Sequence, residues 1–144
     1  MARPGDELRN PHTGQSIRFV SIDDDLLVME TSYKAGGAQA PAHFHPSQEE
    51  RFEVLSGAVL TAVDGEQQVL AEGDTITVPA GTSHTFGGHP EQDATVRWEV
   101  RPALRTDELF ELLFGLADGS RSMPDDGSNP LDEFAAEFQL APQP

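Results

Sequence analysis

The sequence predicts an all-β sandwich or barrel followed by a short helical tail. Between residues 16 and 100 the chain is a succession of short runs rich in β-branched and aromatic residues. Glycine and proline interrupt these runs at intervals of roughly ten residues, which is the strand spacing of all-β sandwiches and barrels. No segment of this region has the apolar periodicity of an amphipathic helix.

The predicted strands begin after an irregular N-terminal arm, in which prolines and glycines interrupt a polar segment. The acidic residues 23–25 separate the first two strands and are predicted to form a solvated turn. Asp64 and Gly65 predict a tight hairpin, because both residue types accept the positive φ values of a type I′ turn. In chain order, the predicted strands span residues 17–22, 26–33, 43–45, 51–55, 58–63, 67–70, 75–78, 84–86 and 95–100.

After residue 102 the pattern changes from strand to helix. Thr106 is a candidate N-cap, the apolar residues that follow give the helix a wide apolar face, and Gly119 is the predicted stop. A second short helix is predicted from residue 130, with Leu131, Phe134 and Phe138 packed on the outside of the β core. The predicted organisation is an N-terminal arm over residues 1–15, a barrel over 16–102 and a helical extension over 103–144.

Length and composition narrow the classes of function. A chain of 144 residues suffices for one domain with one core. The absence of cysteine leaves His, Asp and Glu as the strong metal ligands. A net charge of −16 argues against nucleic acid and anionic membranes as partners, because both require Lys and Arg to displace counterions. Without a secretion signal or a membrane-spanning apolar run, we expect a cytoplasmic protein.

Four residues, His43, His45, Glu50 and His84, point to chemistry. Residues i and i+2 of a strand face the same side, so His43 and His45 can approach one ion. Glu50 follows after a short loop, and His84 lies just beyond residues 79–81, a turn that can return its strand across the sheet. Imidazole and carboxylate ligands suit Fe, Mn, Ni, Cu and Zn. Four such ligands leave coordination positions open, which is typical of a catalytic site.

Glycines and a proline frame these four residues in two segments. The anchors are Gly37, His43, His45, Glu50 and Gly57 in the first segment, and Gly73, Pro79, Gly81 and His84 in the second. Their types and spacing resemble the paired motifs of the cupin superfamily. One position departs from the pattern: Gly88 stands where the second motif often has Asn.

The resemblance implies a double-stranded β-helix, or jelly roll, that holds one divalent transition metal through the same three histidines and Glu50. Iron is the expected metal, with Mn, Zn, Ni and Cu as alternatives. The spacing to Gly57 favours Glu50 over the neighbouring Glu49 as the carboxylate ligand. The whole chain is also similar to small bacterial single-domain cupins that open with the pattern of residues 10–14 and end in helices. This likeness implies a homodimer.

Strand alternation predicts the walls of a substrate pocket. If Glu50 points into the barrel, Phe52 and Val54 point inward as well. The last strand has two faces, and either can point inward. The apolar face carries Val96, Trp98 and Val100, and the polar face carries Thr95, Arg97 and Glu99. The apolar face suits a pocket, so Trp98 is a candidate wall residue. Alternatively, Trp98 is an ordinary residue of the hydrophobic core.

The leading hypothesis is a small metal-dependent enzyme that acts on an uncharged or mildly polar small molecule inside the barrel. The reaction is either a dioxygenase-type oxygenation or a Lewis-acid isomerisation or cyclisation. The sequence contains no clear general base for this pocket, which favours oxygenation. A non-catalytic binding protein and a purely structural jelly roll are the other classes, and four intact ligand positions disfavour the last. No catalytic side chain and no particular substrate is assigned from the sequence.

Overall fold

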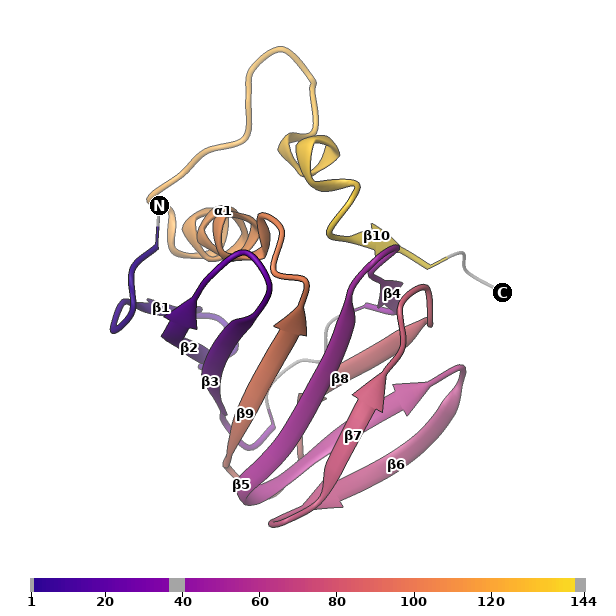
Figure 1. Cartoon of the computed structure of the whole chain (residues 1–144). Coiled ribbons are helices and arrows are strands. Elements are labelled where there is room, and N and C mark those ends of the chain that lie inside the picture. Colours follow the sequence, from indigo (N-terminus) through magenta and orange to yellow (C-terminus); the bar gives the residue numbers. More distant parts are fainter. Residues whose placement is uncertain (1, 37–40, 142–144) are drawn as a thin grey trace.

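The computed structural model describes residues 2–36 and 41–141, and its strands form two β-sheets that share one long strand (Figure 1). In spatial order, the first sheet contains β1 (Glu7–Arg9), β2 (Ser16–Ile22), β3 (Leu27–Tyr33), β9 (Ala94–Arg101), β5 (Glu49–Val63) and β7 (Thr75–Val78). The second sheet contains β10 (Gln139–Leu140), β4 (His43–Phe44), β8 (His84–Gly88), β5 again and β6 (Glu66–Ala71). The strand pairs between described residues are antiparallel, and the predicted jelly-roll fold class is confirmed.

The shared strand β5 joins the two sheets. Its first half pairs with β7 and β9, and its second half pairs with β6 and β8. Gly57 lies at the changeover with φ +75°, and a Cβ atom there would lie 1.8 Å from the carbonyl oxygen of Asp93. The sequence predicts two separate strands here, over residues 51–55 and 58–63. The structure keeps it continuous, because a register shift between Val54 and Ser56 and the left-handed Gly57 absorb the change of sheet.

Side-chain alternation builds the core between the sheets. On β9, Val96, Trp98 and Val100 are buried, whereas the polar residues between them are only partly buried. Of the two orientations left open for this strand, the apolar face therefore points inward. On β5, Phe52 and Val54 alternate in the same way and are each 1% exposed.

Two predicted turns are present. Asp64 and Gly65 have φ values of 51° and 80°, as the type I′ hairpin between β5 and β6 requires. The acidic turn at residues 23–25 is closed by the Asp23 carboxylate, which accepts hydrogen bonds from the backbone N–H groups of Asp25 and Leu26. This carboxylate therefore stabilises the turn itself.

The helical tail begins with α1 (Thr106–Asp118), which crosses one end of the barrel (Figure 1). Arg105 is its N-cap, and Thr106 is instead its first residue, whose hydroxyl accepts a hydrogen bond from Gln48. Gly119 ends the helix in the left-handed conformation, as predicted. The second helix is a short 3-10 helix (Pro130–Phe134). Neither helix of the described chain has the length and apolar character that crossing a membrane would require.

Two short strands were absent from the sequence prediction. β1 lies within the predicted N-terminal arm and pairs with β2, and β10 lies within the predicted helical extension and pairs with β4. Both are too short to carry a recognisable alternation of apolar and polar residues, so tertiary pairing defines them. β10 brings the C-terminal part of the chain beside one of the predicted ligands, because Leu140 pairs with His43.

We predict that Gly57→Ala lowers the free energy of unfolding by about 3 kcal/mol or more, because the new Cβ adds overpacking to left-handed backbone strain. Chemical denaturation followed by circular dichroism measures the loss. Gly65→Ala is the matched control: Gly65 has φ +80° and nothing within 4 Å of the added Cβ. Its expected cost is about 1–2 kcal/mol. Equal losses in the two variants would contradict the close approach at Gly57.

Candidate functional site

A cavity of about 410 Å³, partly open to solvent, contains the four residues that the sequence predicts to bind metal. Its walls come from both sheets, from α1 and from the C-terminal part of the chain. Phe52 and Trp98 line the cavity, whereas Val54 packs within the hydrophobic core and is not among the lining residues described. The aromatic wall residues are Tyr33, Phe52, Phe86, Trp98, Phe110, Phe114 and Phe138.

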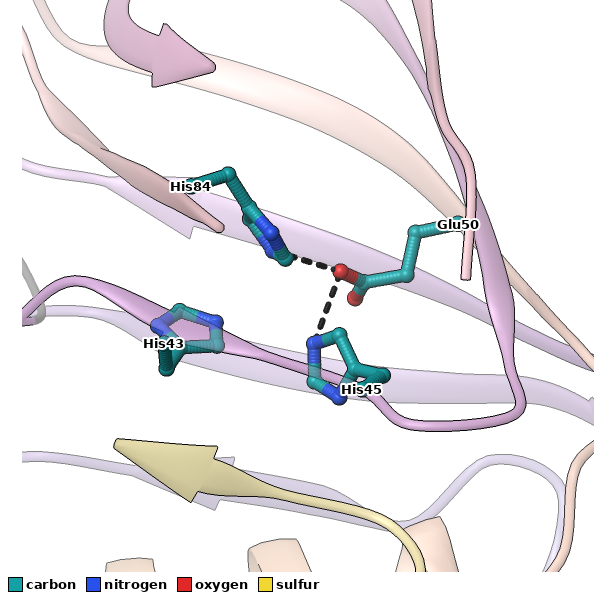
Figure 2. A group of neighbouring side chains, drawn as sticks. All are labelled: His43, His45, Glu50 and His84. Atoms are coloured by element: carbon teal, nitrogen blue, oxygen red, sulfur yellow. Dashed lines mark ion pairs between the residues drawn. The ribbon is translucent and has the colours of Figure 1, made fainter. Parts of the chain in front are cut away.

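The four side chains point toward one another from three strands and one loop (Figure 2). One ligand atom of each lies within 4.8 Å of the others. His43 on β4 pairs directly with His84 on β8, and His45 lies one residue beyond the end of β4. Glu50 comes from β5 and is 1% exposed, whereas its neighbour Glu49 is exposed to solvent and points away from this cluster.

The turn at residues 79–81 ties the second motif to the first. The backbone N–H of Gly81 donates to the carbonyl of His45 at 2.8 Å, and Gly81 adopts φ +76°. This hydrogen bond therefore holds the tight turn that follows β7 against the backbone of His45, a predicted ligand. Gly37, the first anchor of the predicted motif, lies outside the described residues.

Each histidine of the cluster is oriented by a hydrogen bond from its Nδ1 to a backbone carbonyl. Because a carbonyl oxygen only accepts, Nδ1 carries the proton, and Nε2 is left with its lone pair toward the cavity. This second interaction of the ring is a general property of metal-binding histidines. The carbonyls and distances are Pro41 at 2.8 Å for His43, Glu137 at 2.5 Å for His45 and Thr82 at 2.9 Å for His84.

Three buried atoms converge without a hydrogen-bonding partner. Nε2 of His45 and Nε2 of His84 each lie 2.8 Å from Oε1 of Glu50, but none of the three atoms has a partner with hydrogen-bond geometry. Buried acceptors this close are unfavourable unless a cation, either a proton or a metal ion, lies among them. The donor set, three imidazole nitrogens and a carboxylate, fits a divalent transition metal.

The second oxygen of Glu50 is held by Trp98. The indole Nε1–H donates to Oε2 of Glu50 at 2.7 Å, and both side chains are buried. The indole ring packs against Phe52 and Phe110, with centroid distances of 5.4 Å and 4.9 Å. The sequence alone predicts Trp98 only as a wall or core residue. A buried indole N–H requires a hydrogen-bond acceptor, and this requirement could have indicated the contact from the sequence.

The electrostatics of the cluster favour a bound cation. Burial and the neighbouring imidazole of His84 lower the pKa of His43 to about 4, so this ring is neutral at neutral pH. Burial raises the pKa of Glu50, but the contacts with His45 and His84 outweigh burial and lower it, which keeps the carboxylate ionised. Burial lowers the pKa of His45, but the Glu50 carboxylate and the Glu137 carbonyl outweigh burial and raise it. A metal would replace the proton that this pair otherwise shares.

Two residues from the C-terminal part of the chain belong to the site and are not predicted from the sequence. Glu137 supplies the carbonyl that orients His45, and the ring of Phe138 stacks on His43 at 4.9 Å between centroids. Phe138 was expected on an outer helical face with Phe134. The 3-10 helix ends at Phe134, so Phe138 turns into the cavity instead. A backbone carbonyl contact of this kind leaves no mark in the sequence.

Comparisons with known proteins agree with the fold and the motifs. A family model described as a cupin domain matches residues 29–100. A probable oxidoreductase of Hypocrea virens, virH, is 34% identical over 90 residues, which is 57% of this chain and 41% of that protein. Quercetin 2,3-dioxygenase of Bacillus subtilis is 38% identical over 50 residues, which is 35% of this chain and 15% of that enzyme. The matches therefore span less than half of these two curated relatives.

Among solved structures, an RmlC-like cupin from Shewanella frigidimarina has the same fold. The TM-score is 0.61 at 20% sequence identity, and the superposition covers 69% of this chain and 86% of that one. The cupin-domain model spans half of the 144 residues and includes β5, β7 and most of β3 and β9, together with all four residues of the cavity cluster. This chain therefore belongs to the cupin family.

Proposed function

We propose that this cupin binds one divalent transition metal through Nε2 of His43, His45 and His84 and the carboxylate of Glu50, and oxygenates a neutral small molecule in its cavity. The observation that carries the proposal is the convergence of the four ligand atoms within 4.8 Å, with three buried acceptors left without a partner. Iron is the proposed metal, and iron held there would supply redox chemistry toward O2. The same donors also suit Mn, Zn, Ni and Cu.

The lining of the cavity supports a neutral substrate. Among its described lining residues there is neither Lys nor Arg, so a substrate carboxylate or phosphate has no ion-pair partner in the walls. The walls are predominantly aromatic and aliphatic, and a volume of about 410 Å³ falls in the range of small-molecule sites. Planar, weakly polar molecules such as phenols and diketones fit these properties, because their rings can pack against the aromatic walls.

The scarcity of proton-transfer groups supports oxygenation over isomerisation. Apart from the four proposed ligands, Tyr33 is the one ionisable side chain among the described lining residues. Burial raises the pKa of Tyr33 above its usual value, so its phenol stays protonated and is a poor general base. Two of the curated relatives carry the names oxidoreductase and dioxygenase, which agrees with this choice. The expected homodimer stays a prediction.

The chain's own residues would orient the proposed ligands and exclude water. Carbonyl groups hold each imidazole with Nε2 toward the cavity, and Trp98 holds the Glu50 carboxylate from the opposite side. Phe52 and Phe86 stack at 4.1 Å between centroids and form a dry wall beside the ligands. This packing restricts the ligands before any substrate enters, as a preorganised site requires.

We predict that His43→Ala and His84→Ala each abolish stoichiometric metal content, because each removes one of the four donors from a buried site. Elemental analysis of protein purified without added metal measures the outcome. His12→Ala is the matched control, since His12 is exposed and contacts the carbonyl of Ala117 instead. Metal content that stays at the wild-type level in both cavity variants would place the metal elsewhere.

We predict that Trp98→Phe weakens metal binding by about 10- to 100-fold, because the Glu50 carboxylate loses the donor that orients it. Competition with a chromophoric chelator measures the dissociation constant. Phe110→Leu is the control, since Phe110 packs against Trp98 in the same cavity without contacting Glu50 by a hydrogen bond. A Trp98→Phe variant with the affinity of the control would show that this hydrogen bond does not position the carboxylate.

We predict that the iron-loaded protein consumes O2 in the presence of some members of a panel of phenols and diketones, and that Glu50→Gln reduces this rate at least about tenfold. An oxygen electrode measures uptake. Turnover by zinc- or manganese-loaded protein without oxygen uptake would instead identify a Lewis-acid isomerase or cyclase. Binding without turnover, detected by quenching of Trp98 fluorescence, would identify a binding protein.

A further inference from the structure

The C-terminal segment, residues 131–141, closes one side of the cavity. Leu131, Phe138 and Leu140 line the cavity, and β10 places the segment beside β4 (Figure 1). The pairing is extended by the backbone N–H of Ala141, which donates to the carbonyl of Ala42. The segment thus covers the edge of the strand that carries His43.

The segment also contacts two of the four proposed ligands. The carbonyl of Glu137 accepts the Nδ1–H of His45 at 2.5 Å, across 92 positions of sequence. The ring of Phe138 stacks on that of His43 with an interplanar angle of 28° and meets His45 edge-on at 6.2 Å. Without the segment, His45 would lose the acceptor that fixes its tautomer, and His43 would lose one wall.

The other two ligands are held by the barrel itself. His84 donates to the carbonyl of Thr82, two residues earlier on the same turn. Glu50 accepts from Trp98 on β9, the strand next to its own. The hydrogen bonds that orient His43, His84 and Glu50 therefore come from the barrel and its loops. The hydrogen bond that orients His45 comes from the C-terminal segment, which also packs a ring on His43.

The segment is attached by a short strand pair to the second sheet and by side-chain packing to α1. β10 pairs with β4 through two residues, whereas β5 and β9 pair through eight. Phe134 packs with Leu109 and Leu112 of α1, and the Glu137 carboxylate accepts the backbone N–H of Arg105 at 3.2 Å. Residues 119–129, which connect α1 to the segment, are exposed. A segment attached by so short a strand pair opens at a lower free energy than the sheets.

We propose that the C-terminal segment can detach from the barrel and that its docking orients His45 and packs against His43, so that docking of the segment and metal binding are coupled. The inference rests on the metal site proposed above. Coupling between two binding events is reciprocal, so docking tightens metal binding and bound metal holds the segment against the barrel. The segment would also govern the entry of substrate, because it forms part of the cavity wall.

A disulfide across β4 and β10 tests the coupling. Phe44 and Gln139 are directly paired, and Phe44 alternates with the ligands, so its side chain lies outside the cavity lining. The separation of paired residues in antiparallel strands suits a disulfide. The chain has no cysteine, so Phe44→Cys with Gln139→Cys can form one intramolecular bond only.

The probe is release of Zn²⁺ to a chromophoric chelator, measured on the same double variant in its oxidised and reduced forms. We expect the oxidised form to release Zn²⁺ at least about tenfold more slowly, because the bond suppresses opening of the segment. The two single-cysteine variants control for Zn²⁺ held by free thiols. Release rates within twofold of each other in the oxidised and reduced forms would overturn the coupling.

A second variant covers the case in which the disulfide does not form. Phe138→Ala removes the ring that stacks on His43 and should accelerate Zn²⁺ release about tenfold, whereas Phe138→Tyr keeps the ring and should restore the wild-type rate. As a spectroscopic readout, the ¹H–¹⁵N correlations of His45 should lose the single Nδ1–H tautomer in Phe138→Ala. Wild-type release and an unchanged tautomer would overturn the inference.

The outcomes separate this inference from the proposed function. If Zn²⁺ binds in the cavity of the wild-type protein but is released at the same rate whether the segment is docked or open, only the coupling is overturned. A protein that binds no metal overturns both. Hydrogen exchange gives the reciprocal check: saturating Zn²⁺ should slow exchange in residues 131–141 more than in β6, which lies in the same sheet without lining the metal site.

Discussion

The site depends on three hydrogen bonds from histidine Nδ1 atoms to backbone carbonyls. They turn three Nε2 atoms toward one centre, where those of His45 and His84 lie 2.8 Å from the ionised carboxylate of Glu50. An arrangement of buried acceptors around an anion is unfavourable by itself, and a cation in the centre resolves it. The barrel therefore holds imidazole nitrogens and a carboxylate in an arrangement that a bound divalent metal would stabilise. The aromatic walls keep this pattern out of water, where it would be screened.

The fold brings these groups together through one strand. β5 passes from one sheet to the other at Gly57, so Glu50 stands on the same strand that later pairs with His84 of β8. Strand β9, which pairs with the first half of β5, provides the indole of Trp98 that donates to the second carboxylate oxygen of Glu50. Ligands from both segments of the motif thus converge because β5 is continuous. The close approach of Gly57 to Asp93 is part of the same constraint.

The sequence predicted the features that follow from local chemistry. Most of the strands, the Asp64–Gly65 hairpin and the stop at Gly119 follow from residue type and spacing, and the structure contains them. Glu50, which the spacing to Gly57 favours over Glu49, is buried in the cluster, whereas Glu49 is exposed. What the sequence did not predict depends on tertiary contacts. The short strands β1 and β10 exist only because partners lie beside them, and the Glu137 carbonyl that orients His45 is a backbone atom. No residue pattern encodes such contacts.

Nitrogen-15 spectroscopy of the histidine side chains tests the central claim most directly. The chain has five histidines, and the account predicts that Zn²⁺ shifts the Nε2 resonances of His43, His45 and His84 to values typical of metal coordination while each Nδ1 keeps its proton. His12 and His89 should be unaffected. Zinc that leaves the three cavity histidines unchanged, or that binds through their Nδ1 atoms, would contradict the account.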